Sequence, residues 1–429
     1  MKNLLLKVKS TLSDGLVYIL ISGFFTQIIG FLSSIFVIRF LEKTDYGTYV
    51  SANNIYSYFT VFIGMGLAAA MLQFCSEKRS ESEKNDIYCF VLKRGTVFNI
   101  VLFLIIVTFA IIKGRESIEV GKYLFFMAAI PFFSYFTSYY QILLRIKNYN
   151  KGYAVSGMIN AIVVFAINLY FSRKIGALSM IFSQYIGNIA STGFSVFYLK
   201  KENSYDVSFE KAKKIAKNNE KKIVQYAFLT AITNFTSNIL VLIDITCLDI
   251  FTQGNEILAN YKVASVVPTA MLFISTSVIV YYYPKLIYLY SENIDKFLQE
   301  LKLIRRMLVI VNGIIALGLF LFAPLVITLL FGSEYITSIN VFRVLCLNYF
   351  IFGSYRKLYG NMIALIKKVK INLLNTTLSG VFNVILNIIF INKWGEIGAA
   401  LATVCISIFT TAFSIIYFQS QMKKKNSYI

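Results

Sequence analysis

The chain has 429 residues, of which 57% are hydrophobic and 15% charged, and its formal net charge is +21. This apolar content far exceeds that of an ordinary soluble domain, so cytoplasmic segments facing anionic lipid explain the positive charge better than nucleic acid does. The absence of histidine excludes a histidine-ligated metal and a Ser-His-Asp triad. The five cysteines form no CxxC pair and there is no P-loop or GxGxxG sequence, so no metal or cofactor site is predicted.

Apolar stretches follow one another along almost the whole chain. A helix needs about 20 residues to cross the hydrocarbon core of a bilayer. By this measure the sequence predicts twelve membrane-spanning helices. In chain order they cover residues 15–38, 49–73, 89–112, 122–143, 152–171, 176–198, 223–247, 258–284, 306–331, 337–356, 371–391 and 395–418.

Basic residues alternate strongly between the gaps that separate these stretches. Of the 42 Lys and Arg residues, 32 fall in every second gap, beginning with the N-terminus and ending with the C-terminus. Basic residues near the ends of spans are retained on the cytoplasmic side of a membrane. We therefore expect both termini to lie in the cytoplasm.

The longest gap divides the predicted helices into two equal sets. Residues 199–222 contain the basic sequence EKAKKIAKNNEKK and separate six spans from six. We expect an all-α integral membrane protein with an N-terminal lobe at 1–198, a cytoplasmic linker at 199–222 and a C-terminal lobe at 223–429. A weak internal repeat agrees, because DYGTYVSANNIY leads into the second span much as LANYKVASVVP leads into the eighth. Transporters built from two similar halves bind their substrate at the interface of the halves.

Polar residues gather on one face of the predicted span 371–391. At about 100° per residue, six of them share an arc of roughly 120°. They are Asn372, Asn375, Thr376, Ser379, Asn383 and Asn387. Carboxamides both donate and accept hydrogen bonds, which suits sugar hydroxyls, but asparagine also joins neighbouring helices in membranes. Both interpretations stay open.

The predicted span 223–247 has a similar stripe, spread over an arc of roughly 140°. Its members are Tyr226, Thr230, Thr233, Asn234, Ser237, Asn238 and Asp244. Asp244 is the one acidic residue clearly within a predicted span. An acid inside a membrane is a candidate for binding a coupling cation or for pairing with a substrate-binding base. The alternative is a solvated position near the outer interface.

Basic residues near the predicted spans fall into two groups. Arg39, Lys262 and Arg343 lie on the outer side, where positive charge is disfavoured, and are candidates for binding a diphosphate. Arg145 and Arg356 lie near cytoplasmic ends. For these two, extension to anionic lipid headgroups is the simpler interpretation.

Three segments resemble a known family of transporters. They are VIRFLEKTDYGTYV, LLFGSEYITSINVFRVL and NVILNIIFINKWGEIGAALATV. In this order they are similar to segments of the Wzx-type O-antigen and capsule flippases, the polysaccharide-transport branch of the multidrug/oligosaccharidyl-lipid/polysaccharide (MOP) exporter superfamily. The resemblance extends from about residue 16 to residue 417. The small residues Gly398, Ala399, Ala400 and Ala402 would let the last helix approach its neighbours closely.

The resemblance implies two six-helix lobes around a cavity that opens alternately to each side of a bacterial inner membrane. The implied cargo is an oligosaccharide linked to undecaprenyl pyrophosphate, with a polysaccharide polymerase and a chain-length regulator as possible partners. By position and chemistry we assign Arg39, Lys262 and Arg343 to phosphate and Asp244 to ion coupling. Asn234, Asn375, Ser379 and Asn383 are assigned to sugar.

Two other functions compete with this assignment. A multidrug exporter would share the two-lobe architecture, but would be expected to hold acids deep in several spans. A membrane enzyme such as a polysaccharide polymerase would need a long outer loop, and the longest outer gap here has about ten residues. We therefore expect a transporter rather than an enzyme, with the multidrug exporter as the alternative.

Overall fold

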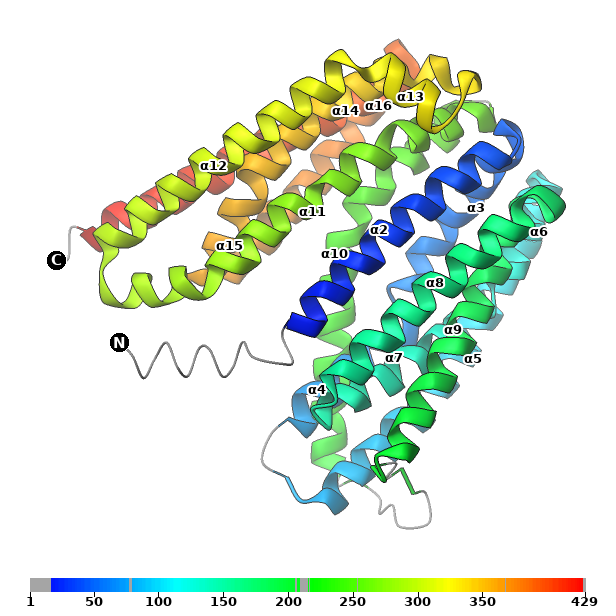
Figure 1. Cartoon of the computed structure of the whole chain (residues 1–429), viewed down its shortest axis with the longest axis vertical. Helices are drawn as coiled ribbons and strands as arrows, with labels where there is room; N and C mark the ends of the chain where they lie inside the picture. The colour runs from blue at the N-terminus through cyan, green and yellow to red at the C-terminus, as the bar shows by residue number, and fades with distance from the viewer. Residues whose placement is uncertain are drawn as a thin grey trace. The chain divides into compact units, whose positions relative to one another are not determined.

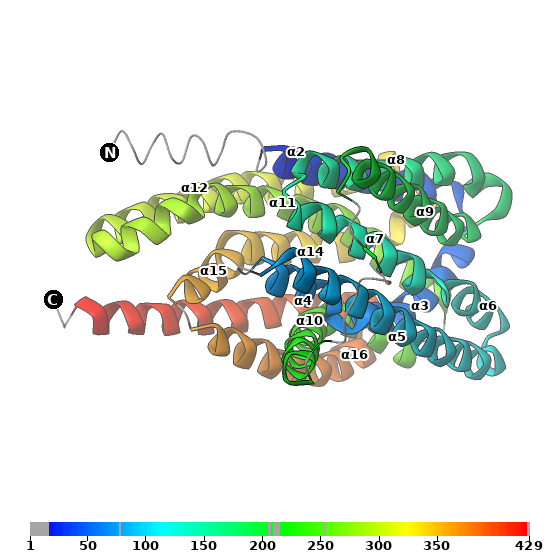
Figure 2. The ribbon, with the colours of Figure 1, turned by 90° about the horizontal axis from the view of Figure 1, so that it is seen from below.

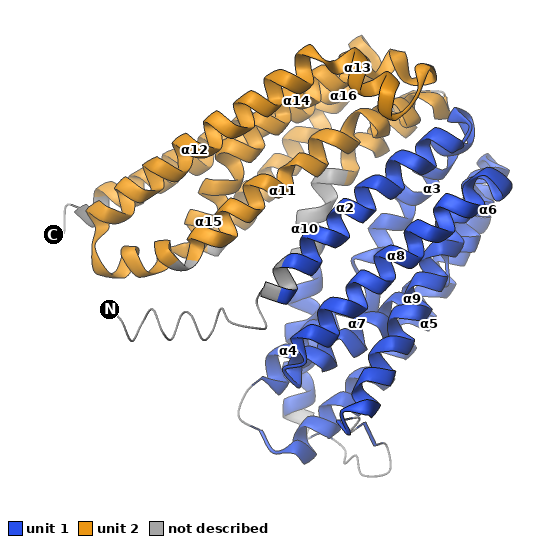
Figure 3. Ribbon diagram, in the orientation of Figure 1, with its two compact units in different colours: residues 1–235 blue, residues 236–429 orange. Residues whose placement is uncertain are grey.

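The computed structural model describes residues 17–76, 79–204, 207–208, 215, 217–252, 254–366 and 368–426. Every regular element within these ranges is a helix. The chain forms two compact units, Met1–Phe235 and Thr236–Ile429 (Figure 3). The boundary falls within helix α10 (Lys217–Phe251), so the first part of this helix belongs to one unit and the second part to the other.

The first unit contains the helices from α2 to the beginning of α10 (Figure 1). In chain order they are α2 (Val17–Phe40), α3 (Lys43–Thr60), η2 (Ile63–Gly66), α4 (Leu67–Cys75), α5 (Glu81–Glu116), α6 (Ile118–Met127), α7 (Ile130–Ile146), α8 (Asn150–Ile175) and α9 (Leu178–Lys201). Helix α8 packs against both α2 and α9. Buried serines line the contact between α8 and α9, where Ser156 Oγ lies 2.8 Å from the Oγ atoms of both Ser191 and Ser195. Small polar residues of this kind let membrane helices approach closely.

The second unit contains the end of α10 and all later helices. They are α11 (Asn255–Glu292), α12 (Ile294–Leu321), α13 (Ala323–Leu330), η3 (Ser333–Ser338), α14 (Ile339–Ile351), η4 (Phe352–Arg356), α15 (Lys357–Leu365) and α16 (Val369–Asn426). Helix α16 is two segments joined at Gly395, whose φ of 56° and ψ of −132° are not helical. Figure 2 shows the two segments, in orange and red, running back alongside each other.

The helices have the length and composition of membrane spans. Within the described ranges, nine helical segments are long and apolar enough to cross a bilayer. The predicted spans 371–391 and 395–418 fall together in one of them, Lys370–Lys423, which turns at Gly395. The protein is therefore an all-α, multispanning membrane protein, as predicted. The number of twelve spans, the cytoplasmic termini and the division into lobes at 1–198 and 223–429 stay predictions, and much of the predicted linker 199–222 lies outside the described residues.

The first segment of α16 exposes its apolar side and buries its polar side. Val381 is 58% exposed and Ile385 48% exposed, whereas Asn375 and Ser379 are completely buried. This is the reverse of a helix in a soluble protein and is expected where the surroundings are lipid. The predicted polar face of this helix is thus confirmed, and it is turned into the second unit.

Candidate functional site

Asp244 lies at the centre of a buried polar cluster in the second unit. Its side chain is 5% exposed, so the carboxylate is buried rather than solvated. Oδ2 accepts hydrogen bonds from Tyr261 OH at 3.0 Å and from Thr403 Oγ1 at 2.6 Å. Oδ1 accepts from Asn383 Nδ2 at 3.1 Å and from Asn387 Nδ2 at 2.9 Å. The cluster therefore unites α10, α11 and both segments of α16.

The turn at Gly395 brings Thr403 to this cluster. A side chain at Gly395 would be strained by its positive φ, so glycine is the residue that suits this reversal of direction. In the returning segment, a Cβ atom at Gly398 would collide with the carbonyl oxygen of Phe390. The next residue, Ala399, is completely buried. The prediction that these small residues permit close helix packing is confirmed, and the consequence is the position of Thr403.

The donors around Asp244 are neutral. Among the described residues its partners are hydroxyl and amide groups, so no positive charge balances the carboxylate. An unbalanced charge buried in a membrane protein is costly, and it is relieved by a proton or by a cation. Asn387 Oδ1 is also buried without a hydrogen-bond partner. The cluster thus combines one negative charge with an unused oxygen acceptor, which fits a single bound cation.

Asn375 and Ser379 bond within α16. Asn375 Nδ2 donates to Thr410 O and to Ser414 Oγ, both at 3.1 Å, while Ser379 Oγ donates to Asn375 O at 2.5 Å. The two bonds of Asn375 join the segments of the helix, as the interhelical interpretation expects, whereas the bond of Ser379 stays within the first segment. The side chain of Asn234 lies outside the described residues. The assignment of Asn234, Asn375, Ser379 and Asn383 to sugar stays a prediction.

The three residues predicted to bind phosphate lie on separate helices. Arg39 is exposed in the last turn of α2, in the first unit. Lys262 follows Tyr261 in α11, and Arg343 lies in α14, both in the second unit. The guanidinium of Arg343 lies 5.6 Å from the ring centre of Phe320, and its Nε atom is buried without a hydrogen-bond partner. Their role in binding phosphate stays a prediction.

Tyr261 and Thr403 complete the Asp244 cluster but were not singled out from the sequence. Both occur in segments that drew attention for other reasons, the internal repeat LANYKVASVVP and the small-residue segment GEIGAALATV. In the sequence each is a hydroxyl residue in an otherwise apolar or small-residue segment. Such a residue becomes a candidate for the site only when the fold shows that its hydroxyl faces a carboxylate.

The first unit holds a second carboxylate with neutral partners, that of Asp45. This residue lies in the first turn of α3, within the segment DYGTYV. Asp45 Oδ2 accepts a hydrogen bond from the backbone N–H of Ala177 at 3.0 Å, and Oδ1 accepts one from Tyr123 OH. A Cβ atom at Gly176, where φ is 61°, would lie 2.6 Å from Asp45 Oδ2. Asp45 therefore fastens α3 to α6 and to the turn between α8 and α9.

Comparison with known proteins places these features in a family. Residues 12–287 match the family model described as polysaccharide biosynthesis protein. The chain belongs to this family. It is also 23% identical, over 406 residues, to an uncharacterized membrane protein of Methanocaldococcus jannaschii, with 91% of this chain and 94% of that protein covered.

Solved structures of MOP-superfamily transporters have the same fold. The lipid II flippase MurJ, in an inward closed conformation, is similar with a TM-score of 0.74 at 19% identity, covering 94% of this chain and 87% of that one. An inward-facing multidrug resistance MATE transporter gives a TM-score of 0.75 at 13% identity, covering 93% and 96%. A MOP transporter from Pyrococcus furiosus gives 0.63 at 13% identity, covering 95% and 94%. The family and the shared fold together confirm the predicted resemblance to the polysaccharide-transport branch.

Proposed function

We propose that this protein is a flippase for lipid-linked oligosaccharide. It moves repeat units carried on undecaprenyl pyrophosphate from the cytoplasmic to the outer leaflet of a bacterial inner membrane, for O-antigen or another surface polysaccharide. The match of residues 12–287 to the polysaccharide biosynthesis family carries this proposal. The fold shared with a lipid II flippase supports it, because that protein handles a lipid-linked substrate. A polysaccharide polymerase would receive the product, and a chain-length regulator would act with the polymerase.

Transport by this flippase is coupled to a cation that binds at Asp244. The single negative charge of the carboxylate matches one monovalent cation or one proton. If the ion is a metal such as Na⁺, Asp244, Asn387 Oδ1 and the hydroxyl of Thr403 are the groups that would hold it, because hard cations prefer oxygen. The cluster joins α10, α11 and α16, so a change in its occupancy changes the packing of three helices at once.

The substrate contacts belong to the same proposal. Arg39, Lys262 and Arg343 would bind the diphosphate, since arginine offers two parallel donors to phosphate oxygens. Sugar hydroxyls would exchange with the hydrogen bonds that Asn375 and Ser379 now make inside α16. Such an exchange requires the two segments of α16 to separate locally at this position.

A reconstituted transport assay tests the function. Proteoliposomes containing the full chain and a fluorescent undecaprenyl-diphosphate oligosaccharide are followed with a membrane-impermeant quencher. Transfer of the label between leaflets, driven by a Na⁺ or a proton gradient, is the expected result. Asp244→Asn should abolish the dependence on the gradient. Asp295→Asn is the matched control, because Asp295 is exposed in the same unit.

The assay also separates the flippase from a multidrug exporter, whose fold is shared to a similar degree. The same vesicles are loaded with a cationic dye in place of the lipid. Gradient-driven efflux of the dye, without transfer of the lipid-linked oligosaccharide, would replace the flippase with the exporter.

A further inference from the structure

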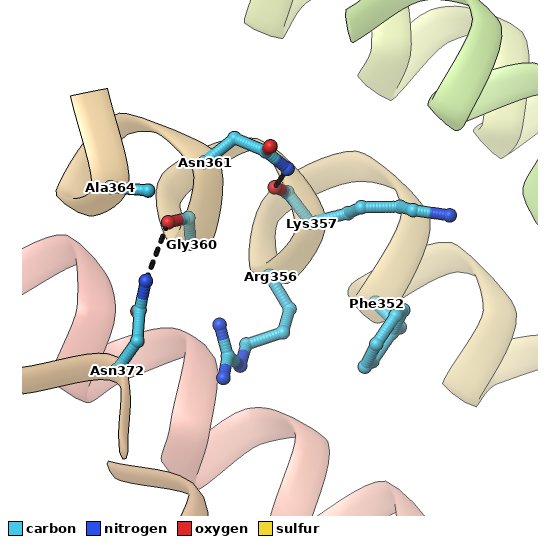
Figure 4. Close-up of a pocket in the computed structure, with 7 residues that line it drawn as sticks. All are labelled: Phe352, Arg356, Lys357, Gly360, Asn361, Ala364 and Asn372. Atoms are coloured by element: carbon cyan, nitrogen blue, oxygen red, sulfur yellow. Dashed lines mark hydrogen bonds between the residues drawn. The ribbon is translucent and has the colours of Figure 1, made fainter. Parts of the chain in front are cut away.

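A cavity of about 360 Å³ lies in the second unit, apart from the Asp244 cluster. It is formed where η4, α15 and the beginning of α16 meet. The side chains of Phe352, Arg356, Lys357, Asn361, Ala364 and Asn372 line it together with Gly360 (Figure 4). None of these residues contacts Asp244, so the cavity is a separate site.

A local widening of the helix shapes one wall of the cavity. Residues Phe352–Arg356 form a turn of π-helix, in which the N–H of Lys357 bonds to the carbonyl of Phe352, five residues earlier. Such insertions in α-helices are frequent at functional sites. Beyond the turn, Leu358, Tyr359 and Met362 are buried in the apolar core of the unit. Because these residues hold one face of α15, the face with Arg356, Gly360 and Ala364 is left to the cavity.

Arg356 brings an unbalanced positive charge to this cavity. Among the described residues its guanidinium has no hydrogen-bond or ion-pair partner, and Figure 4 shows it beside Asn372. A Cβ atom at Gly360 would lie 2.6 Å from Arg356 Nη1, so the glycine leaves the space that the guanidinium occupies. Partly buried arginine without a carboxylate partner is suited to phosphate, which it binds through two parallel donors.

Two neighbours add to the specificity of the cavity. Lys357 Nζ is turned away from the guanidinium and bonds to Thr276 Oγ1 and Leu272 O of α11, so a second positive charge is fixed nearby without a carboxylate. Asn372 Nδ2 donates to Gly360 O at 2.8 Å, while its Oδ1 is buried and has no partner. The cavity thus offers the guanidinium of Arg356 as donor to an anion, with the charge of Lys357 nearby, and one free acceptor for a hydroxyl group.

We propose that this cavity binds the phosphate group of a membrane lipid whose headgroup also carries a hydroxyl. The predicted topology places residue 356 at the cytoplasmic end of its span, in the leaflet that holds acidic lipid. Two sources of this chemistry are a polyprenyl diphosphate that bears a sugar and an acidic phospholipid such as phosphatidylglycerol. The binding does not require the proposed transport.

Lipid binding to the purified full chain in neutral detergent tests this site. Undecaprenyl-diphosphate sugar, phosphatidylglycerol and phosphatidylcholine are titrated separately, and bound lipid is counted by native mass spectrometry. Arg356→Gln should weaken binding of at least one of the two acidic lipids by about tenfold or more, as expected for a lost charge-assisted pair. Arg306→Gln is the matched control, because Arg306 is exposed on α12 of the same unit. It should change binding less than about twofold.

Two further variants keep the test independent of stability. Arg356→Lys retains the charge and should recover part of the affinity. Gly360→Ala retains the arginine but fills the space beside Nη1, so it should weaken binding while the protein remains folded. Preference for the diphosphate sugar would identify the site as part of the substrate path, and preference for phosphatidylglycerol would identify a lipid-regulated site. Equal affinities of wild type, Arg356→Gln and Gly360→Ala for both acidic lipids would overturn the proposal.

Discussion

Each of the two units holds a carboxylate with neutral partners, and the two carboxylates are stabilised differently. Asp45 lies in the first turn of α3, where the partial positive charge of a helix N-terminus favours an anion. One of its partners is the backbone N–H of Ala177. Asp244 lies outside the first and last turns of α10, and its donors among the described residues are all side chains.

This difference separates a structural acid from one that can exchange its partners. A backbone N–H in a turn keeps its direction, so the environment of Asp45 is fixed by the fold. Hydroxyl and carboxamide groups rotate, and each can present an oxygen instead of a hydrogen atom. The groups around Asp244 can therefore stabilise the free carboxylate and also take part in holding a cation. The comparison predicts that Asp45 contributes to stability and Asp244 to transport.

The largest expected effect is that of Asp244→Asn on gradient-driven transport. The substitution removes the negative charge but keeps the size of the side chain, so the cation loses its main ligand. Transport should fall by about a hundredfold, within the usual range of coupling energies between sites. Initial rates in proteoliposomes, with the amount of folded protein determined separately, measure this loss. Wild-type gradient dependence in this variant would remove Asp244 from the coupling mechanism.

Gly398→Ala should disturb the same cluster from a distance. The new methyl group would clash with the carbonyl oxygen of Phe390, and because this is a backbone atom no side-chain rotation can relieve the clash. The two segments of α16 must then separate, which should lower the free energy of unfolding by about 2–3 kcal/mol. It should also move Thr403 away from Asp244. Thermal unfolding in detergent measures the first effect and cation binding the second, and Gly318→Ala on α12, with open space around its Cβ position, is the control.

Asp45→Asn should lower stability and leave cation-dependent transport unchanged, in contrast to Asp244→Asn. The backbone N–H of Ala177 would lose a charged acceptor, and the free energy of unfolding should fall by about 1.5–2 kcal/mol. Cation dependence should be unchanged in the protein that remains folded. Unfolding and transport are measured on the same preparation. A loss of cation dependence at unchanged stability would show that the proposed division between the two acids is wrong.

The sequence predicted the faces of helices better than the partners of those faces. Six polar residues at helical spacing placed the stripe of α16 correctly, since periodicity follows from helix geometry alone. That Asn383 and Asn387 face Asp244 depends on a contact with a residue more than a hundred positions earlier in the chain. That Thr403 joins them depends on the turn at Gly395. The cavity beside Arg356 depends on a π-turn, which changes the periodicity locally and leaves no sign in hydropathy. Hydrophobic and polar patterns therefore do not predict which residues distant in the sequence contact one another.

The smallest expected effect is that of Tyr261→Phe on cation affinity. The direction of the change shows whether Tyr261 stabilises the free carboxylate or binds the cation. Tyr261 OH donates to Asp244 Oδ2 at 3.0 Å, so it stabilises the Asp244 carboxylate in the state without bound cation. Without this donor the free state is less stable, and cation affinity should rise by about threefold, equivalent to a typical net hydrogen bond. Isothermal titration with Na⁺ at constant pH measures the change. Tyr349→Phe is the control, because that hydroxyl donates to Asn312 elsewhere in the unit. A fall in affinity would mean that the Tyr261 oxygen itself holds the cation, so that the tyrosine acts as a ligand and not as a rotating donor.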